Sequence, residues 1–176
     1  MIEVELRARF GRQKHDELLV FLNKNAESLG NDDKDVYYFI LPDRLLKLVN
    51  NTTKHAAKLS LKLNRIGRGA AFEEIECGIV PDQFGNAVNL VKALNLTRKV
   101  IHEPQQRQNF SYKGCEIALK FSKTWGHHME IESLIDNNAD TSAAEKKVHA
   151  VAKELGVTLM TEQELTRFVE SIENKL

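Results

Sequence analysis

The N-terminal segment of this chain, residues 2–10, alternates strictly between apolar and charged side chains. A period of two predicts a β-strand, because successive side chains of a strand point to opposite faces. One face of this strand is apolar throughout, and the other carries only acids and bases: Glu3, Glu5, Arg7 and Arg9. The fold must therefore accommodate a sheet face that is fully ionic.

Similar alternation recurs along the chain and predicts about eight strands, most of them antiparallel because their connections are short. After the first strand, the predicted strands cover residues 35–41, 45–49, 57–64, 72–79, 98–112, 114–122 and 126–135. A helix is expected at about 13–28, with Gly30 as its stop signal, and another from Pro81 to about residue 94.

The C-terminal part is predicted to be helical. The segments 142–145 and 161–164 both fit the capping box, and Gly156 is expected to end the first of the two helices. The whole chain then reads as one α+β domain over residues 1–176, with strands in about 1–135, helices in about 141–174 and a flexible connection at 67–69.

The charged strand faces leave two arrangements open. If the sheet closes into a barrel, the charges line its interior and the apolar faces pack against helices outside. If the sheet stays open, its charged face lies in water. Alternation alone favours the open sheet.

Composition limits the partners. The chain has 25 Lys plus Arg and 25 Asp plus Glu, so its net charge of zero cannot attract a polyanion from afar, and any anion site must be local. We therefore expect no nucleic-acid partner. The apolar runs are too short for a membrane span and the start does not resemble a secretory signal, so a cytoplasmic protein without membrane contact is expected.

Cys77 and Cys115 stand alone, which argues against a disulfide framework or a zinc module.

Three Glu-x-Glu units are the sharpest chemical feature. Each unit delivers two carboxylates to one face of a strand, because residues i and i+2 point the same way. The units are Glu3 with Glu5, Glu74 with Glu76, and Glu130 with Glu132. Converging carboxylates repel one another unless a divalent cation lies between them, and hard oxygen ligands suit Mg²⁺ or Mn²⁺.

Four basic residues could share the same interior: Arg7, Lys47, Lys62 and Arg107. Cations opposite a metal-binding carboxylate cluster form the arrangement needed to hold a chain of phosphates.

These motifs resemble the CYTH superfamily, the triphosphate tunnel metalloenzymes. Glu-Val-Glu-Leu-Arg at 3–7 is similar to the ExExK signature of that family. Further elements follow in the family's order: residues 35–39 resemble D-x-Y-F, 46–48 part of L-R-x-R, 57–62 L-T-x-K, 74–76 the central E-x-E, 107–110 part of K-x-R-x-x-Y, and 125–132 G-x-F-x-E-I-E. The resemblance covers about residues 1–135 and reverses the preference for an open sheet.

The resemblance implies a closed eight-stranded antiparallel β-barrel, or triphosphate tunnel, with helices packed outside. It further implies that Glu3, Glu5, Glu130 and Glu132 are ligands of Mg²⁺ or Mn²⁺ or orient water. By the same resemblance, Arg7, Lys47, Lys62 and Arg107 bind phosphate oxygens, and Glu5, Glu74 and Glu76 serve catalysis by orienting water or cations.

Three positions depart from the family pattern. Val49 replaces the second base of L-R-x-R, Gln105 replaces the Lys of K-x-R, and Lys120 replaces an acidic residue after the seventh-strand apolar run. Lys120 could take over phosphate binding, or the tunnel could bind anions without catalysis.

The leading functional hypothesis is a metal-dependent phosphohydrolase of inorganic triphosphate, a nucleoside triphosphate or thiamine triphosphate. The alternatives are a class IV adenylyl cyclase, which makes cyclic AMP from ATP, and a non-catalytic tunnel that binds polyphosphate or nucleotide. The expected partner is a small-molecule triphosphate. No sequence feature argues for a particular oligomeric state.

Overall fold

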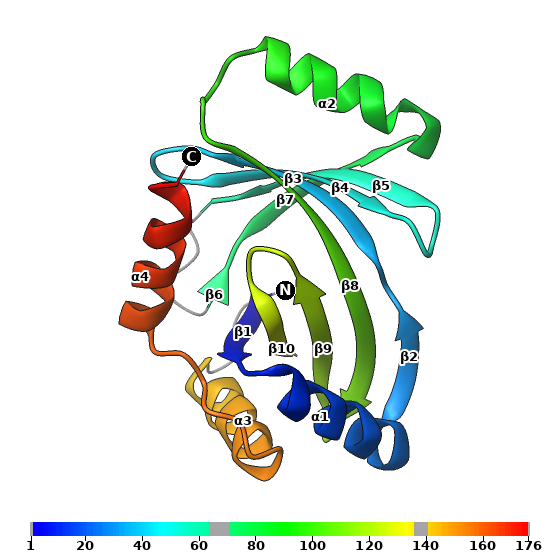
Figure 1. Ribbon diagram of the computed structural model, residues 1–176, viewed down its shortest axis with the longest axis vertical. Helices are drawn as coiled ribbons and strands as arrows, with labels where there is room; N and C mark the ends of the chain where they lie inside the picture. The colour runs from blue at the N-terminus through cyan, green and yellow to red at the C-terminus, as the bar shows by residue number, and fades with distance from the viewer. Residues whose placement is uncertain (1, 64–70, 136–140, 176) are drawn as a thin grey trace.

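The computed structural model describes residues 2–63, 71–135 and 141–175. Strands dominate the first three quarters of the chain, and two helices end it (Figure 1). The strands are β1 (Ile2–Arg9), β2 (Glu27–Asn31), β3 (Lys34–Ile40), β4 (Leu45–Asn51), β5 (Ala56–Lys62), β6 (Ala71–Phe72), β7 (Glu74–Ile79), β8 (Val100–Tyr112), β9 (Cys115–Ser122) and β10 (Gly126–Ile135). The helices are α1 (Arg12–Asn25), α2 (Phe84–Ala93), α3 (Thr141–Glu154) and α4 (Glu162–Glu173), with a short 3₁₀ turn η1 (Pro81–Gln83) before α2.

One antiparallel sheet organises the molecule. Its strand order is β6-β1-β10-β9-β8-β3-β4-β5-β7, and β2 pairs with β8 beside this path. The sheet curls strongly, so that its two ends approach one another around a central space (Figure 1). The predicted α+β class and antiparallel pairing are thus confirmed.

The predicted closure of the barrel is correct only in part. The curled sheet is a partial barrel: within the described residues, β1 and β7 are not paired with each other. The two ends are linked instead through β6, whose two residues pair with β1, while β7 pairs with β5. A stretch as short as β6 cannot supply a full ladder of hydrogen bonds, which is why the sheet is not closed along its length.

The distribution of polarity is inverted relative to an ordinary solvated sheet. The convex face is apolar and lies under the helices: one buried cluster, including Leu22, Phe110 and Val148, packs α1 and α3 against β8, β9 and β10. A second cluster, including Phe39, Leu48 and Val88, packs α2 against β3 and β4. Burial of these faces fixes the register of each strand, because a slip of one residue would turn the apolar side chains inward. The charged side chains therefore face the concave side.

Two boundaries differ from the sequence prediction. The helix expected at about 13–28 ends at Asn25, and residues 27–31 form the additional strand β2. Gly30 is not a helix stop; it lies in β2 with a φ of 84°, at a register shift where β2 pairs with β8. A bulge of this kind favours glycine for the same reason that a helix end does, namely a positive φ, so the sequence signal was ambiguous.

The C-terminal helices follow the predicted pattern with one exception. Thr161 and Glu164 form the expected capping box at the start of α4. Gly156, with a φ of 62°, follows the end of α3 as predicted. The exception is Ser142: because α3 begins at Thr141, Ser142 lies inside its first turn and is not its cap. The connection predicted at 67–69 lies outside the described residues.

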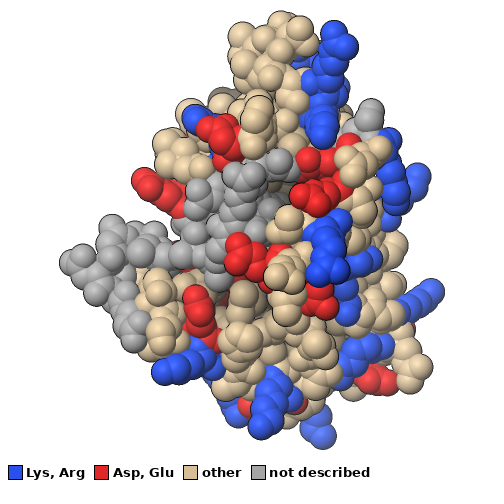
Figure 2. Space-filling view, turned by 90° about the vertical axis from the view of Figure 1, so that its left-hand side faces the viewer, with Lys and Arg blue, Asp and Glu red and all other residues tan. Residues whose placement is uncertain are grey.

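The outer surface has mixed charge. On the described part of the face in Figure 2, acidic and basic side chains are interspersed, as the zero net charge suggests. In the ranges that the structure covers, no helix is long and apolar enough to cross a membrane.

Candidate functional site

The concave face of the sheet, together with α4, encloses a cavity of about 280 Å³, called here the central cavity. Every residue that the sequence analysis assigned to the site lines it: Glu3, Glu5, Arg7, Lys47, Lys62, Glu74, Glu76, Arg107, Lys120, Glu130 and Glu132. They converge because each is on the inward face of its strand and the strands surround one space. The three departures from the family pattern, Val49, Gln105 and Lys120, line the cavity as well.

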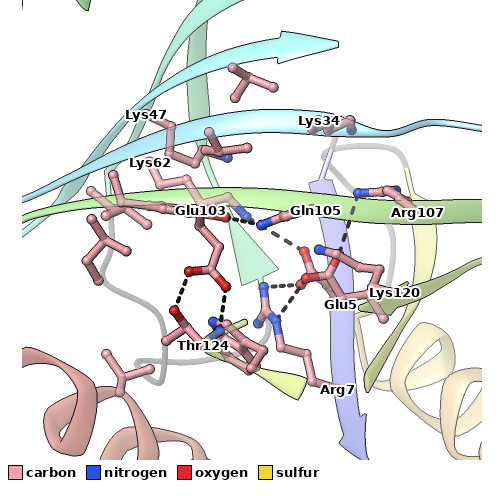
Figure 3. A pocket seen from close by; sticks show the side chains of 18 of the residues that line it. Glu5, Arg7, Lys34, Lys47, Lys62, Glu103, Gln105, Arg107, Lys120 and Thr124 are labelled. Carbon is pink, nitrogen blue, oxygen red and sulfur yellow. Dashed lines mark hydrogen bonds and ion pairs between the residues drawn. The ribbon is translucent and has the colours of Figure 1, made fainter. Parts of the chain in front are cut away.

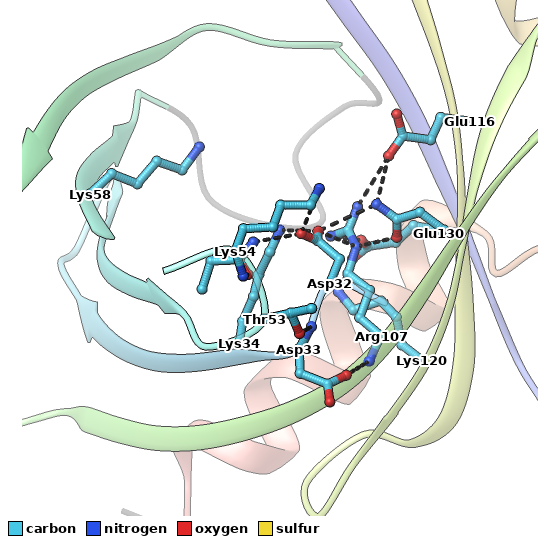
Figure 4. Close-up of polar contacts among 12 residues, drawn as sticks. Asp32, Asp33, Lys34, Thr53, Lys54, Lys58, Arg107, Glu116, Lys120 and Glu130 are labelled. Atoms are coloured by element: carbon cyan, nitrogen blue, oxygen red, sulfur yellow. Dashed lines mark hydrogen bonds and ion pairs between the residues drawn. The ribbon is translucent and has the colours of Figure 1, made fainter. Parts of the chain in front are cut away.

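Glu130 is the most heavily neutralised carboxylate of the cavity. Its oxygens lie 3.2 Å from Arg7 Nε, 2.9 Å from Lys120 Nζ and 3.6 Å from Arg107 Nη1. Arg7, Lys120 and Arg107 are labelled in Figure 3, and Glu130 is labelled with Lys120 and Arg107 in Figure 4. Burial would raise the pKa of Glu130, but the three cations hold it well below its ordinary value. Glu130 therefore organises cations from three strands.

Lys120 is buried at the centre of this cluster. Burial lowers the pKa of its ammonium to about 8, against the opposing effect of Glu130. The neighbouring His128 also lines the cavity, and burial together with Lys120 lowers its pKa to about 4. The adjacent His127 contacts the rings of His15 and Phe121 instead. The two histidines diverge, because adjacent strand residues point to opposite faces.

A second group of contacts centres on Glu5. Arg7 forms an ion pair with Glu5, and Lys62 Nζ lies 3.7 Å from its other carboxylate oxygen. Burial opposes ionisation of Glu5, yet Arg7 and Lys62 bring its pKa below the ordinary value. Arg7 thus bridges Glu5 and Glu130, and it carries one positive charge for two buried carboxylates.

The Glu74–Glu76 unit of β7 contacts lysines of β4 and β5. Lys47 Nζ lies 2.7 Å from Glu74, which also accepts a hydrogen bond from Ser60. Burial would raise the pKa of Glu74, but Lys47 lowers it to about 2. Glu76 pairs with Lys58 nearer to solvent.

Glu3 and Glu132 have a different environment from the other carboxylates. Burial, together with a hydrogen bond and repulsion from Glu5, raises the pKa of Glu3 to about 8. Burial and repulsion from Glu5 and Glu116 raise the pKa of Glu132 to about 7. Glu5 lies opposite Glu132 in the β1–β10 ladder, and its carboxylate repels those of both Glu132 and Glu3. Glu3 and Glu132 therefore have too little positive charge around them, whereas Glu5 is neutralised by Arg7 and Lys62.

The donor chemistry of Glu3, Glu5 and Glu132 suits Mg²⁺ or Mn²⁺, since all three offer carboxylate oxygens that repel one another. Among the described residues, however, no group of three such side chains is arranged so that it could hold a metal ion without adjustment. A cation held there would therefore require side-chain adjustment.

Glu132→Gln is expected to stabilise the folded protein. The folded-state pKa of about 7 exceeds the ordinary value of 4.5, so wild-type stability falls as pH rises from about 4.5 to about 7. Because glutamine does not ionise, the variant avoids this loss of stability. After a discount for the partial exposure of this side chain, we expect the free energy of unfolding to rise by about 1–2 kcal/mol at about pH 8 and by much less at about pH 5. Urea unfolding measures the change. Glu145→Gln, on an exposed helix face, should change little. A variant no more stable than wild type at about pH 8 would contradict the repulsion.

A polar network that the sequence analysis did not anticipate holds one end of the cavity. Asp32, only 4% exposed, lies 2.9 Å from Lys34 Nζ, 3.0 Å from Lys54 Nζ and 3.4 Å from Arg107 Nε (Figure 4). Asn51 and Asn109 donate hydrogen bonds to the same carboxylate. The β2–β3 connection that carries Asp32 thus fixes Arg107 in position.

Asp32→Asn is expected to destabilise the protein by about 2–3 kcal/mol at neutral pH, since it removes the counter-charge of the partly buried Lys34 and one of those of Arg107. Lys34 and Lys54 depress the pKa of Asp32 against the effect of burial. The stabilisation is therefore fully present at neutral pH, begins to weaken as pH falls below the unfolded value of about 3.8, and disappears only as pH falls through the lower folded-state pKa. Urea unfolding at about pH 7 and about pH 3 measures this. An effect as large at about pH 3 as at about pH 7, or one matched by the exposed Asp82→Asn, would argue against the network.

Period-two spacing could have found several further lining residues. Lys34 and Tyr38 share an inward face of β3, and Glu103 shares one of β8 with Gln105 and Arg107. Val169 and Ile172 of α4 also line the cavity. Strand alternation gives no indication of these two, because their position depends on how α4 packs.

The sequence matches no family model and no curated protein sequence. Solved structures with the same fold exist. One is a conserved hypothetical protein from Pyrococcus furiosus, with a TM-score of 0.71, 21% identity and coverage of 90% of this chain and 94% of that one. Another is a candidate adenylate cyclase from Vibrio parahaemolyticus, with a TM-score of 0.67, 15% identity and coverage of 93% and 92%.

A third similar structure comes from Hippeastrum. It is a candidate adenylyl cyclase described as having a dominant triphosphatase activity, with a TM-score of 0.63, 16% identity and coverage of 90% and 89%. At these identities the likeness shows a common fold. The shared fold agrees with the architecture that the motif resemblance implied, except that the sheet is not closed along its length.

Proposed function

We propose that this protein, which shares its fold with candidate adenylate cyclases, is a metal-dependent triphosphatase. The observation that carries the proposal is the joint lining of one cavity by basic residues and carboxylates, among them Arg7, Lys47, Lys62, Arg107 and Lys120 together with Glu3, Glu5, Glu74, Glu130 and Glu132. Phosphoryl transfer needs positioning and charge neutralisation above all, and this arrangement offers both.

The basic residues are proposed to bind the phosphate oxygens. Each of them is paired with a carboxylate in the described structure: Arg7, Arg107 and Lys120 with Glu130, Lys47 with Glu74, and Lys62 with Glu5. Phosphate oxygens would compete with these carboxylates for the same N–H donors. Arg7 and Arg107 can bind two oxygens at once, whereas the lysines act as point charges. The existing ion pairs keep the donors oriented before the substrate arrives.

Glu3, Glu5 and Glu132 are the residues that we assign to Mg²⁺ or Mn²⁺. A bound divalent cation would neutralise phosphate oxygens and increase the acidity of a coordinated water. Glu130, assigned to the metal by resemblance, is surrounded by three cations, so its primary role is proposed to be positioning of Arg7, Arg107 and Lys120.

Glu74 and Glu76 are proposed to orient water and cations along the opposite wall. In the hydrolysis, a water oxygen forms a bond to the terminal phosphorus while the bridging bond to the next phosphate breaks, which releases orthophosphate. Glu74 keeps a low pKa and is therefore ionised at neutral pH, so it can accept a hydrogen bond from the attacking water and orient it, while the proton of the water passes to a phosphate oxygen. The fixed charges around it need no reorganisation during the reaction.

We further infer that the partial barrel acts as a closed tunnel. Residues 71–79 pair with β1 at their start and with β5 afterwards, and only Glu73 separates the two pairings. One continuous segment thus joins both ends of the sheet around the central cavity.

Product analysis tests the proposed function. Purified protein is incubated with ATP, inorganic triphosphate or thiamine triphosphate, with Mg²⁺ or Mn²⁺ and with a chelator control. Orthophosphate release that stops with chelator supports the triphosphatase. Cyclic AMP with pyrophosphate would indicate an adenylyl cyclase instead, and binding without turnover would indicate a non-catalytic tunnel.

A further inference from the structure

Helix α2 presents more apolar side chains than the sheet covers. Phe84, Val88 and Val91 are buried against β3 and β4. Leu90 and Leu94 are one turn apart and continue this apolar side, since residues three or four positions apart are neighbours on a helix. They nevertheless remain 63% and 59% exposed. Among the described residues, part of the apolar side of α2 is therefore left uncovered.

The connection between α2 and β8 extends this exposed apolar area. Leu96 is 50% exposed and follows Asn95, whose φ of 50° turns the chain at the end of the helix. At the top of Figure 2, where α2 lies, uncharged side chains protrude and basic side chains lie beside them. The α2 surface is the name used here for three exposed leucines and three exposed bases: Leu90, Leu94, Leu96, Lys92, Arg98 and Lys99.

The charge of the α2 surface has one sign. No acidic residue occurs in residues 83–102, a stretch that contains all three bases, although the whole chain has 25 acids and 25 bases. Glu173 lies 3.7 Å from Lys99, but it is buried in the lining of the central cavity. Asp43, in the adjacent β3–β4 turn, is paired with Arg44 at 2.6 Å. The α2 surface therefore combines exposed leucines with a local excess of positive charge.

These properties are complementary to a membrane leaflet that contains anionic lipids. Its headgroup phosphates attract Lys and Arg, and the boundary below them accepts leucine side chains. A second copy of this chain would instead bring like charges together. A protruding surface rests on a flat leaflet without any match of shape, whereas a protein partner would need a groove. The expectation of no membrane contact came from the shortness of the apolar runs, which concerns membrane spans and not contact at the surface.

We propose that the α2 surface attaches the protein reversibly to membranes that contain anionic lipids. The three leucines enter the boundary between headgroups and acyl chains, and the three bases contact lipid phosphates. A contact of this size is weak, and its electrostatic part is sensitive to ionic strength. The inference is independent of the proposed function, because α2 packs on the convex face of the sheet and the central cavity lies on the concave face.

The first test is cosedimentation of the full chain with lipid vesicles at low ionic strength. We expect at least about tenfold tighter binding to phosphatidylcholine vesicles with about 30% phosphatidylglycerol than to pure phosphatidylcholine. Salt at about 0.5 M should remove most of this preference through screening. Equal binding to both kinds of vesicle would overturn the proposal. A protein that stays in solution with both would also overturn it and would leave an acidic protein partner as the cover of α2.

The second test removes the apolar part of the contact. The double variant Leu90→Ser with Leu94→Ser should bind anionic vesicles at least about tenfold more weakly than wild type, because it loses two inserted side chains. Val20→Ser, which alters a 72% exposed side chain of α1, is the control and should bind as wild type does. Urea unfolding checks that the double variant folds, as expected for changes at exposed positions. Undiminished vesicle binding by the folded double variant would overturn the proposal.

The third test removes the charges. Lys92→Gln with Arg98→Gln should reduce the preference for anionic vesicles by about tenfold or more, since each base near the surface contributes to the attraction. Lys24→Gln with Lys146→Gln makes the same change in net charge at exposed positions of α1 and α3, and it should leave the preference nearly unchanged. An equal loss in both double variants would assign the attraction to the overall charge of the protein and overturn the role of the α2 surface.

Discussion

Glu5→Gln is expected to lower kcat by about a thousandfold or more while leaving the fold intact. Glu5 is buried, lies between Glu3 and Glu132 in the repulsive group and is paired with Arg7 and Lys62. Glu5 thus interacts both with the proposed metal ligands and with the proposed phosphate-binding residues. Glutamine keeps the shape but cannot supply the negative charge. Initial rates with the best triphosphate substrate, with and without chelator, measure the effect.

The same experiment contains its controls. Circular dichroism and urea unfolding show whether Glu5→Gln folds, and we expect it to fold because Arg7 keeps its contact with Glu130. Removal of the divalent cation by chelator should abolish wild-type turnover to a similar extent. Retention of more than about a tenth of the wild-type kcat in the folded variant would exclude a central role for Glu5.

Lys62→Met is expected to raise KM by about tenfold to a hundredfold, the effect of losing one charge-assisted contact to a phosphate oxygen. Lys62 is 5% exposed and lies opposite Glu74 in the β5–β7 ladder, with its ammonium directed toward Glu5. Methionine preserves much of the apolar stem, so the change isolates the charge. Steady-state kinetics and a direct dissociation constant for a non-hydrolysable analogue together separate binding from chemistry.

Lys146→Met is the matched control for Lys62→Met. Lys146 is exposed on α3, away from the lining of the central cavity, and carries the same charge. It should leave KM and the dissociation constant unchanged. If both variants raise KM equally, the effect comes from the overall field of the protein and an inward role of Lys62 is excluded.

Much of the candidate site was predictable because strand alternation is a strictly local property. Glu3, Glu5 and Arg7 follow one another at intervals of two on β1, so any sheet that contains this strand directs all three to one face. The same argument applies to Glu130 and Glu132 on β10. Once the apolar faces lie under the helices, the charged faces must turn toward the space that the sheet surrounds. The roles of these residues in metal and phosphate binding stay predictions.

The pairing of charges was beyond the sequence. Glu130 contacts Arg7 from β1, Lys120 from β9 and Arg107 from β8, and these partners are up to 123 positions apart along the chain. Asp32 received no assignment, although it anchors Arg107, because its importance depends on where the β2–β3 connection meets β8. The prediction that Gly30 ends a helix is wrong for a related reason: a positive φ is required both at a helix end and in the β2 bulge where Gly30 lies.

The sequence by itself determined most of the strands, the two faces of each and the residue types that share the cavity, since a period of two and the burial of apolar side chains act over a few residues. Only the tertiary structure decided which carboxylates are neutralised and which repel one another, because electrostatic energies depend on separation and burial. It also decided that the sheet curls without full closure and that Val169 and Ile172 of α4 line the central cavity. Those features arise from packing between segments that are far apart in the chain.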